Sequence, residues 1–315
     1  MHTRKLGYTD LNLTSMGLGA WAIGGGGWKF SWGNQDDADS VKTIHRALDL
    51  GINWIDTAPV YGTGHSEVVV GEALKGLSQR PIIATKCGRS WDENRVPFAM
   101  LKADVIRKEI DDCLQRLGVE VIDLYQMHWP QPDEDIEEAW GVMAEGVKAG
   151  KLRYIGVCNY NVAQLKRIQA IHPVASLQPP YSMLVRGVEA ELLSFCAVNN
   201  IGVVAYSPMQ KGILTDKFSR ASVAGLAADD HRKSFDANFQ EPALSKNLAL
   251  VEGLKPIAKK HNKSVAQLAI AWVLRRPEVT SAIVGARRPD QIEETVGGGD
   301  WVLSAEDVAA IEALP

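Results

Sequence analysis

The chain has 315 residues, of which 46% are hydrophobic and 23% charged, and its formal net charge is −4. This composition is typical of a globular protein with room for one large α/β domain, and it offers no basic surface for nucleic acid. No apolar run is long enough to span a bilayer, and the first ten residues lack the apolar core of a signal peptide. Four scattered cysteines without a C-x-x-C motif indicate free thiols in a reducing compartment. We therefore expect a cytoplasmic protein without a metal site.

Short apolar segments alternate with amphipathic helical segments along nearly the whole chain. The first segment predicts a small hairpin, followed by a strand that ends near Gly19. Further strands are predicted over residues 52–56, 81–86, 121–128, 152–159, 175–178, 201–207 and 280–285. Helices are predicted over residues 36–51, 66–77 with Ser66 as N-cap, 102–118, 134–150, 161–171, 188–200, 243–261, 264–276, 289–298 and 304–314.

Eight strands that alternate with helices predict a single (β/α)8 TIM barrel domain over residues 1–315. The hairpin at the N-terminus and the extra helices near the C-terminus are additions to this barrel. No strand is followed by a G-x-G-x-x-G segment that opens a helix, which argues against a Rossmann domain. A barrel with polar groups at its strand ends is normally an enzyme, although that inference rests on the fold.

Polar side chains mark the ends of three successive strands. Asp56 ends the strand over 52–56 and is followed by Tyr61, Lys86 ends the next strand, and His128 ends the one after. A lysine at a strand end is usually paired or reaches water, and a histidine beside a tryptophan is usually structural. All four groups are harder to explain by packing, because the carboxyl ends of barrel strands meet at one rim where active sites lie. We therefore expect a catalytic site there.

A run of four glycines at residues 24–27 precedes Trp28 and Trp32. This segment is either an ordinary surface loop or a mobile rim loop that holds tryptophans over a pocket, and the tryptophans favour the second interpretation. A pocket wall of tryptophans would suit an apolar substrate or a sugar-like one. The candidates for this wall are Trp21, Trp28, Trp32, Trp91 and Trp129.

The stretch from about residue 210 to 241 has a weak pattern. We expect it to fold over a cofactor as a lid that includes Asp230, Arg232 and Phe239, so that cofactor release is a candidate slow step.

Six blocks in chain order resemble conserved motifs of the aldo-keto reductase superfamily, with a pattern closest to bacterial NADP-dependent members. The first is GINWIDTAPVYGTGHSEVVVGEAL, which resembles the family's Asp-Thr-Ala-x-x-Tyr-Gly signature. The others are ATKCG, IDLYQMHWP, GKLRYIGVCNYN, VVAYSPMQKGILTDKF and SAIVGARRPDQIEE. The resemblance covers nearly the whole chain.

The resemblance implies a catalytic tetrad of Asp56, Tyr61, Lys86 and His128. Tyr61 would be the general acid that protonates the carbonyl oxygen. Lys86 would lower its pKa, which is about 10 for an isolated tyrosine. Asp56 would pair with Lys86 so that the lysine is not a lone buried charge. His128 would orient the carbonyl oxygen by a hydrogen bond.

The resemblance also implies an extended NADP(H) cofactor over the barrel mouth. Tyr206 would stack on the nicotinamide, and Asn159 and Gln178 would bind its carboxamide. Arg287 is the main argument for NADP, because a guanidinium matches a 2'-phosphate, although the Arg287–Arg288 pair could also be a solvated surface pair. The implied cofactor residues are Gly19, Ala20, Trp21, Asn159, Gln178, Tyr206, Ser207, Pro208, Met209, Gly212, Lys217, Gly285, Ala286, Arg287, Gln291 and Glu294.

Three positions depart from the family pattern. Cys158 replaces a usual serine, Asp216 a usual glycine and Thr295 an asparagine that often ends the last motif. Cys158 is therefore not counted as a ligand, and fewer adenine contacts are expected.

The sequence predicts NADPH-dependent reduction of an aldehyde or ketone to the alcohol. The partner would be a small-molecule carbonyl or alcohol, with no nucleic acid and no membrane. Two alternatives stay open: an enzyme that mainly oxidises a polyol or inositol-like alcohol, and a low-turnover cofactor sensor that resembles potassium-channel β subunits. No segment of the sequence predicts the oligomeric state.

Overall fold

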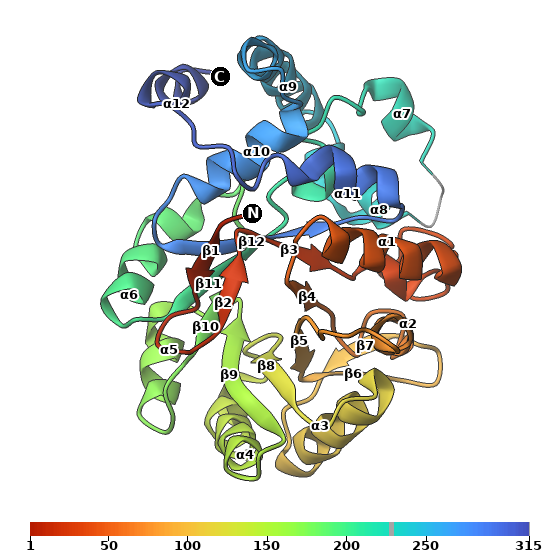
Figure 1. The fold of residues 1–315 in the computed structure, drawn as a ribbon, viewed down its shortest axis with the longest axis vertical. Helices are drawn as coiled ribbons and strands as arrows, with labels where there is room; N and C mark the ends of the chain where they lie inside the picture. The colour runs from red at the N-terminus through yellow and green to blue at the C-terminus, as the bar shows by residue number, and fades with distance from the viewer. Residues whose placement is uncertain (227–229, 315) are drawn as a thin grey trace.

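The computed structural model describes residues 1–226 and 230–314, without the side chains of residues 234 and 235. Its centre is a closed barrel of eight parallel strands in the order β10-β11-β12-β3-β4-β5-β8-β9 (Figure 1). These strands are β3 (Met16–Gly19), β4 (Trp54–Asp56), β5 (Ile82–Cys87), β8 (Ile122–Met127), β9 (Leu152–Cys158), β10 (Ser176–Gln178), β11 (Gly202–Tyr206) and β12 (Val279–Gly285). The predicted TIM barrel is thus confirmed, and each strand follows its prediction within a few residues.

Helices surround the barrel, because each crossover between parallel strands must cover their outer apolar face (Figure 1). Along the first half of the chain they are α1 (Asp37–Asp49), α2 (His65–Leu74), α3 (Ala103–Leu117), α4 (Ile136–Lys148) and α5 (Val162–Gln169). In the second half they are α6 (Leu192–Val198), α7 (Arg220–Ala224), α8 (His231–Phe235), α9 (Ala243–Lys260), α10 (Val265–Leu274), α11 (Pro289–Val296) and α12 (Ala305–Glu312).

The expected N-terminal hairpin covers one end of the barrel. It consists of β1 (Thr3–Lys5) and β2 (Asn12–Thr14), which pair antiparallel. Leu6 lies between them and is fully buried in the cluster that fills the barrel interior. Gly7 has φ +51°, and a Cβ at this residue would lie 2.5 Å from Asn200 O, so only glycine allows this close contact.

Trp54 fills the barrel interior and explains a neighbouring glycine. Its indole Nε1 donates to Ser281 Oγ at 3.1 Å, so the buried N–H is satisfied. A Cβ at Gly17 would lie 2.1 Å from the Trp54 ring. Trp54 and Gly17 therefore fill the barrel interior on the side of the N-terminal hairpin. The open end of the barrel lies at the C-termini of its strands.

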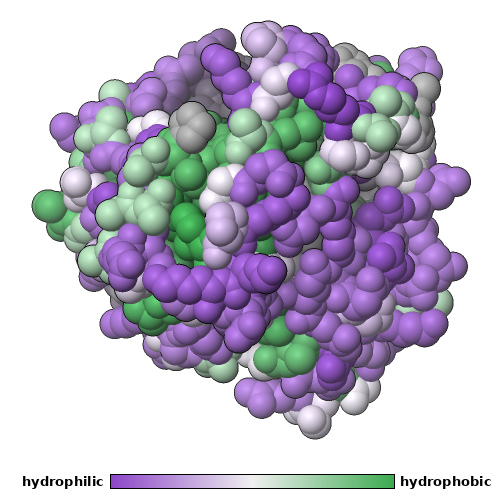
Figure 2. Space-filling view, turned by 90° about the horizontal axis from the view of Figure 1, so that it is seen from above, coloured by the Kyte–Doolittle hydropathy of each residue, from purple (hydrophilic) through white to green (hydrophobic). Residues whose placement is uncertain are grey.

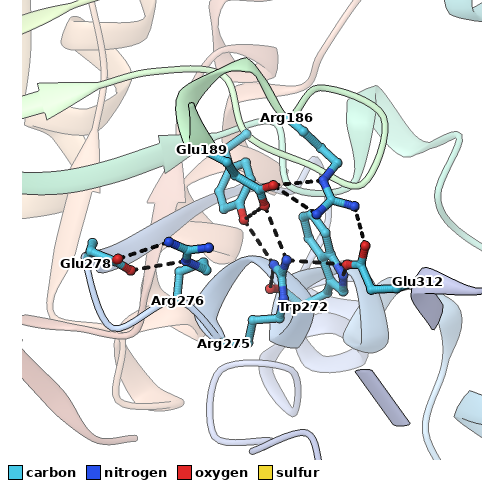
Figure 3. A network of polar contacts seen from close by, with 8 residues as sticks. Arg186, Glu189, Trp272, Arg275, Arg276, Glu278 and Glu312 are labelled. Carbon is cyan, nitrogen blue, oxygen red and sulfur yellow. Dashed lines mark hydrogen bonds and ion pairs between the residues drawn. The ribbon is translucent and has the colours of Figure 1, made fainter. Parts of the chain in front are cut away.

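The C-terminal helix α12 is tied to the barrel by a network of charged side chains (Figure 3). Arg275, the residue that follows α10, stacks on Trp272 with its guanidinium carbon 3.6 Å from the ring centroid, and it also contacts Glu189 and Glu312. Arg186 bridges the same two carboxylates, so several charges act together. Networks of this kind stabilise more than isolated surface pairs do.

Some local predictions were wrong. Ser66 is not an N-cap, since Gly64 caps α2, and its hydroxyl instead donates to Ala20 O at 2.9 Å. The segment after Lys86, where no strand was predicted, contains an antiparallel pair, β6 (Arg89–Trp91) and β7 (Pro97–Ala99). By contrast, the four cysteines are free thiols as predicted.

The face shown in Figure 2 is mostly hydrophilic, with apolar residues grouped in a few smaller areas. Among the helices of the described residues, none is long and apolar enough to cross a membrane.

Candidate active site

A cavity of about 710 Å³ lies at the open end of the barrel, where the strands end. Asp56, Tyr61 and His128 line it, while Lys86 is fully buried behind them. Loops hold these groups by continuing the sheet hydrogen bonds beyond the strands: Ala20 N donates to Asp56 O at 2.8 Å, and His128 N donates to Cys87 O at 3.0 Å. The structure thus brings the four predicted catalytic residues together.

Lys86 is the centre of this group. Its Nζ donates to Asp56 Oδ2 at 2.6 Å, to Thr57 O at 2.9 Å and to Tyr61 Oη at 3.3 Å. A buried ammonium needs a paired charge and further acceptors, and all three donor positions are used here. The lysine therefore stays charged and touches the phenol oxygen.

The other carboxylate oxygen of Asp56, Oδ1, accepts hydrogen bonds from the side-chain amides of two glutamines. Gln178 Nε2 donates to Asp56 Oδ1 at 2.8 Å and to Gln126 Oε1 at 3.2 Å. Gln126, which was not predicted as a site residue, also donates to Asp56 Oδ1, at 3.2 Å. The Gln178 NH2 group is thus used within the protein, and its Oε1 is the atom left for a ligand.

Burial and charge oppose one another at Tyr61. Burial raises the pKa of its phenol to about 12, although the Lys86 cation lowers it. The pKa therefore lies above 10 and not below it as expected, because desolvation is the larger effect. Burial also lowers the pKa of Lys86, but Asp56 and Tyr61 outweigh it and the pKa is raised. The phenol is protonated and the lysine charged at neutral pH.

His128 is a neutral imidazole. Burial, together with the charges of Lys86 and Arg89, holds its pKa well below the usual 6.5. Its ring meets the Tyr61 ring edge-on, with centroids 5.9 Å apart. Its Nδ1 is buried and has no hydrogen-bond partner among the described residues. One ring nitrogen of this neutral ring carries a proton and can donate it in a hydrogen bond.

Two residues that directly follow strands adopt left-handed backbone conformations. Asn159 after β9 has φ 64° and Ser207 after β11 has φ 56°. Such conformations cost free energy and collect at functional sites. They direct the chain around the cavity rim, where Tyr206 Oη donates to Asn159 Oδ1 at 2.9 Å and Asn159 Nδ2 donates to His128 O at 3.1 Å.

All of the expected cofactor residues line this one cavity, which extends from the tetrad to the start of α11. At that far end, Lys217 pairs with Glu294, and Arg287 N donates to Gln291 Oε1 at 2.7 Å. A helix N-terminus with adjacent cations suits a phosphate group. A mainly apolar cavity that extends from an amide acceptor near the tetrad to cations at the start of α11 therefore fits a dinucleotide.

Arg287 is held by the glycine-rich loop after β3. Its Nε donates to Gln35 Oε1 at 2.8 Å and its Nη1 to Trp32 O at 3.1 Å, and its Nη2 donates to Asn34 O. Gln35 Nε2 returns a bond to Arg287 O at 2.8 Å. Arg288 instead pairs with Asp290 at the exposed start of α11. The Arg287 guanidinium thus joins the cofactor end of the cavity to the loop that carries the tryptophans.

The tryptophans predicted as pocket walls are placed unequally. Trp21 stacks on Tyr61 with ring centroids 5.4 Å apart, and Trp28 and Trp32 lie against Trp21. These three and Trp129 line the cavity, whereas Trp91 does not. Trp91 lies further along the β6–β7 hairpin, toward its turn, so the expectation for this residue is not met.

The predicted lid segment contacts the loop after β3. The Arg232 guanidinium lies 4.9 Å from the Trp32 ring centroid and pairs with Asp230. Phe239 does not itself line the cavity, but its ring centroid lies 5.4 Å from that of Phe218, which does. Residues 227–229 of the expected lid lie outside the described residues, and lid movement stays a prediction.

Glu67, Gln126 and Arg89 also lie around the tetrad, although none of them was predicted as a site residue. Glu67 is fully buried and accepts hydrogen bonds from Arg116 Nε at 2.6 Å and from Thr85 Oγ1 of β5, the residue before Lys86. Gln126 lies two positions before His128, and Arg89 lies three after Lys86. The signal for Gln126 and Glu67 was their polarity within buried segments, since such groups need partners.

An eight-stranded parallel barrel with polar groups converging at its strand ends is the architecture of a barrel enzyme. The Aldo/keto reductase family model matches residues 15–315. Aldo-keto reductase YhdN of Bacillus subtilis (strain 168) is 38% identical over 317 residues, which cover 100% of this chain and 93% of that protein. The NADH-specific methylglyoxal reductase of Escherichia coli (strain K12) is 35% identical over 323 residues, covering 98% and 97%. The chain therefore belongs to the aldo/keto reductase family, and it is an oxidoreductase of carbonyl groups.

A solved structure supports the same assignment. The glycerol dehydrogenase AKR11B4 from Gluconobacter oxydans superimposes with a TM-score of 0.90 and is 39% identical, covering 99% of this chain and 94% of that one. The family uses a nicotinamide cofactor.

Proposed function

We propose that this protein reduces a small aldehyde or ketone with NADPH, with Tyr61 as the general acid. The observation that carries the proposal is the contact chain Asp56–Lys86–Tyr61, which opens onto the cavity that also holds the expected cofactor residues. The nicotinamide, when bound, supplies a hydride to the carbonyl carbon, and the chain supplies the proton.

The proton comes from the Tyr61 hydroxyl. As the carbonyl oxygen gains charge, Tyr61 transfers its proton to that oxygen, and Lys86 at 3.3 Å stabilises the tyrosinate that remains. Asp56 balances the lysine charge and keeps Nζ in place. In the reverse direction the tyrosinate accepts the proton of an alcohol. The Gluconobacter oxydans relative is named a glycerol dehydrogenase, which supports that direction as well.

His128 positions the carbonyl oxygen. Because its pKa is lowered, the ring stays neutral and donates a hydrogen bond without competing with Tyr61 as an acid. Trp21, stacked on Tyr61, limits the directions from which a carbonyl can approach.

Arg287 supports a preference for NADPH, since a guanidinium binds a 2'-phosphate better than a neutral group does. Its contacts with Trp32 and Gln35 would have to change when that phosphate binds. The Escherichia coli relative is named as NADH-specific, so the preference needs a direct measurement.

The test compares Tyr61→Phe with Tyr8→Phe. Tyr8 loses the same hydroxyl at the N-terminal hairpin, where it contacts Pro173 O at 3.4 Å. We expect Tyr61→Phe to abolish turnover of aldehydes with NADPH while leaving NADPH binding nearly unchanged, and Tyr8→Phe to retain turnover. Normal turnover in Tyr61→Phe would refute the assignment of the acid. NADPH binding without turnover of any carbonyl or alcohol by the unmodified protein would favour a sensor instead.

A further inference from the structure

Arg89 lies on β6, at the end of the cavity that holds His128. Together with Pro97 and Trp129 it lines the cavity wall. Its Nη2 donates to Gln131 Oε1 at 2.9 Å, and its guanidinium carbon lies 5.5 Å from the Trp129 ring centroid. The side chain therefore follows the segment that begins at His128, and its charge contributes to the lowered pKa of that histidine.

Among the cationic side chains that line the cavity, Arg89 is the one at the His128 end, and it pairs with no carboxylate among the described residues. Six cationic side chains line the cavity, and Lys211, Lys217, Arg232 and Arg288 each pair with a carboxylate. Arg287 is held by the loop acceptors Gln35, Trp32 and Asn34 at the cofactor end. Within residues 1–226 and 230–314, Arg89 makes no ion pair, and its side chain donates one hydrogen bond, to Gln131.

Glu109 holds the residues on both sides of Arg89 in place. Glu109 is 9% exposed and accepts hydrogen bonds from Gly88 N at 2.8 Å and Ser90 Oγ at 3.3 Å, on either side of Arg89. The arginine is thus presented by a rigid support, as a group that binds a ligand must be. A partly buried guanidinium keeps its charge and gains most from an anionic partner with two oxygens.

The geometry points to Arg89 as the residue that selects carbonyl substrates carrying an anionic group, in particular a carboxylate. The carboxylate binds the guanidinium while the carbonyl oxygen faces Tyr61 and His128. The mainly aromatic walls of Trp21 and Trp129 enclose the carbon chain between them. This inference rests on the proposed carbonyl reduction and adds the class of substrate. It assigns no new chemical step.

The competing explanation is that Arg89 only orients Trp129. In that case its removal would affect charged and neutral substrates alike. A selective role predicts that only substrates with an anionic group lose efficiency, so matched substrate pairs separate the two explanations.

The experiment measures kcat/KM for two such pairs, 4-carboxybenzaldehyde with 4-nitrobenzaldehyde and succinic semialdehyde with butanal. We expect Arg89→Gln to lower kcat/KM for the anionic members by about 10- to 100-fold, the range for a lost charge-assisted contact, and to change the neutral members little. Arg89→Lys should retain part of the preference. Arg107→Gln, which removes the same charge from the exposed face of α3, is the control.

Each outcome decides the inference. Equal losses for both members of a pair, or no loss in Arg89→Gln, would overturn it while leaving carbonyl reduction intact, because the neutral aldehydes would still be reduced. If the unmodified protein turned over none of the four aldehydes, the proposed function would be overturned, and this inference with it.

Discussion

The contacts of Arg287 lead to a specific prediction about cofactor choice. The guanidinium donates to three acceptors of the loop after β3, namely Gln35, Trp32 and Asn34. If it also binds a 2'-phosphate, at least part of these contacts must be exchanged for contacts to the ligand. NADPH affinity then reflects the difference between the two sets, and Gln35 becomes a competitor of the phosphate.

The magnitude follows from one hydrogen bond. A net contribution of about 1 kcal/mol corresponds to roughly a fivefold change in Kd. We expect Gln35→Ala to tighten NADPH by up to about fivefold and to leave NADH unchanged. Gln35→Glu places a carboxylate beside Arg287 and should weaken NADPH selectively. Arg287→Ala should weaken NADPH about 10-fold or more and NADH little.

The assay is titration of tryptophan fluorescence with each cofactor, for the two Gln35 variants in both the Arg287 and the Arg287→Ala background. In the latter background the Gln35 changes should no longer alter the ratio of the two affinities. Equal weakening of NADPH and NADH binding by Arg287→Ala would refute a role in binding the 2'-phosphate. The arginine would then only hold the loop after β3 against the barrel.

Three further predictions concern the tetrad and its support. Gln126→Leu removes a bond to Asp56, and we expect kcat to fall by roughly fivefold with the fold retained; an unchanged kcat would contradict a positioning role. Alcohol oxidation needs the tyrosinate of Tyr61, whose pKa is raised to about 12, so its kcat/KM should rise about tenfold per unit between about pH 7 and about pH 9 while reduction stays flat. A plateau in this range would assign the proton to another group. Burial raises the pKa of Glu109 to about 7, so the folded state loses stability as pH rises from about 4.5 to 7. Glu109→Gln should raise the free energy of unfolding by on the order of 3 kcal/mol at about pH 8 and by nearly nothing at about pH 4, measured by denaturant unfolding.

Much of the fold follows from the sequence because the barrel strands are short apolar runs bounded by strong breaks. The run over residues 52–56 ends at Asp56, Pro59 follows three positions later, and β4 covers Trp54–Asp56 of this run. The tetrad could be predicted for the same reason, since strand ends fix where side chains meet. The β6–β7 hairpin was missed because its pairs, such as Trp91 with Pro97, lack alternating hydrophobicity.

Contacts between distant loops could not be predicted from the sequence. Gln35 and Arg287 are 252 positions apart, and their hydrogen bonds depend on how the loop after β3 turns. Gln126 lies in a strand whose other residues are buried, and only the closed barrel shows that its amide faces Asp56. The net rise in the pKa of Tyr61 is likewise a property of burial, which a list of nearby charges does not contain.

The closure of the barrel has a consequence for the synthesis of the protein. β3 pairs with β4 on one side and on the other with β12, where Gly17 is opposite Ile283. At about 5–20 residues per second, a ribosome needs on the order of 10–50 s to make the residues between those two strands. Throughout that time one edge of β3 has no strand partner, and an unpaired edge invites association with other chains. The growing chain therefore depends on covering that edge until its last strand emerges.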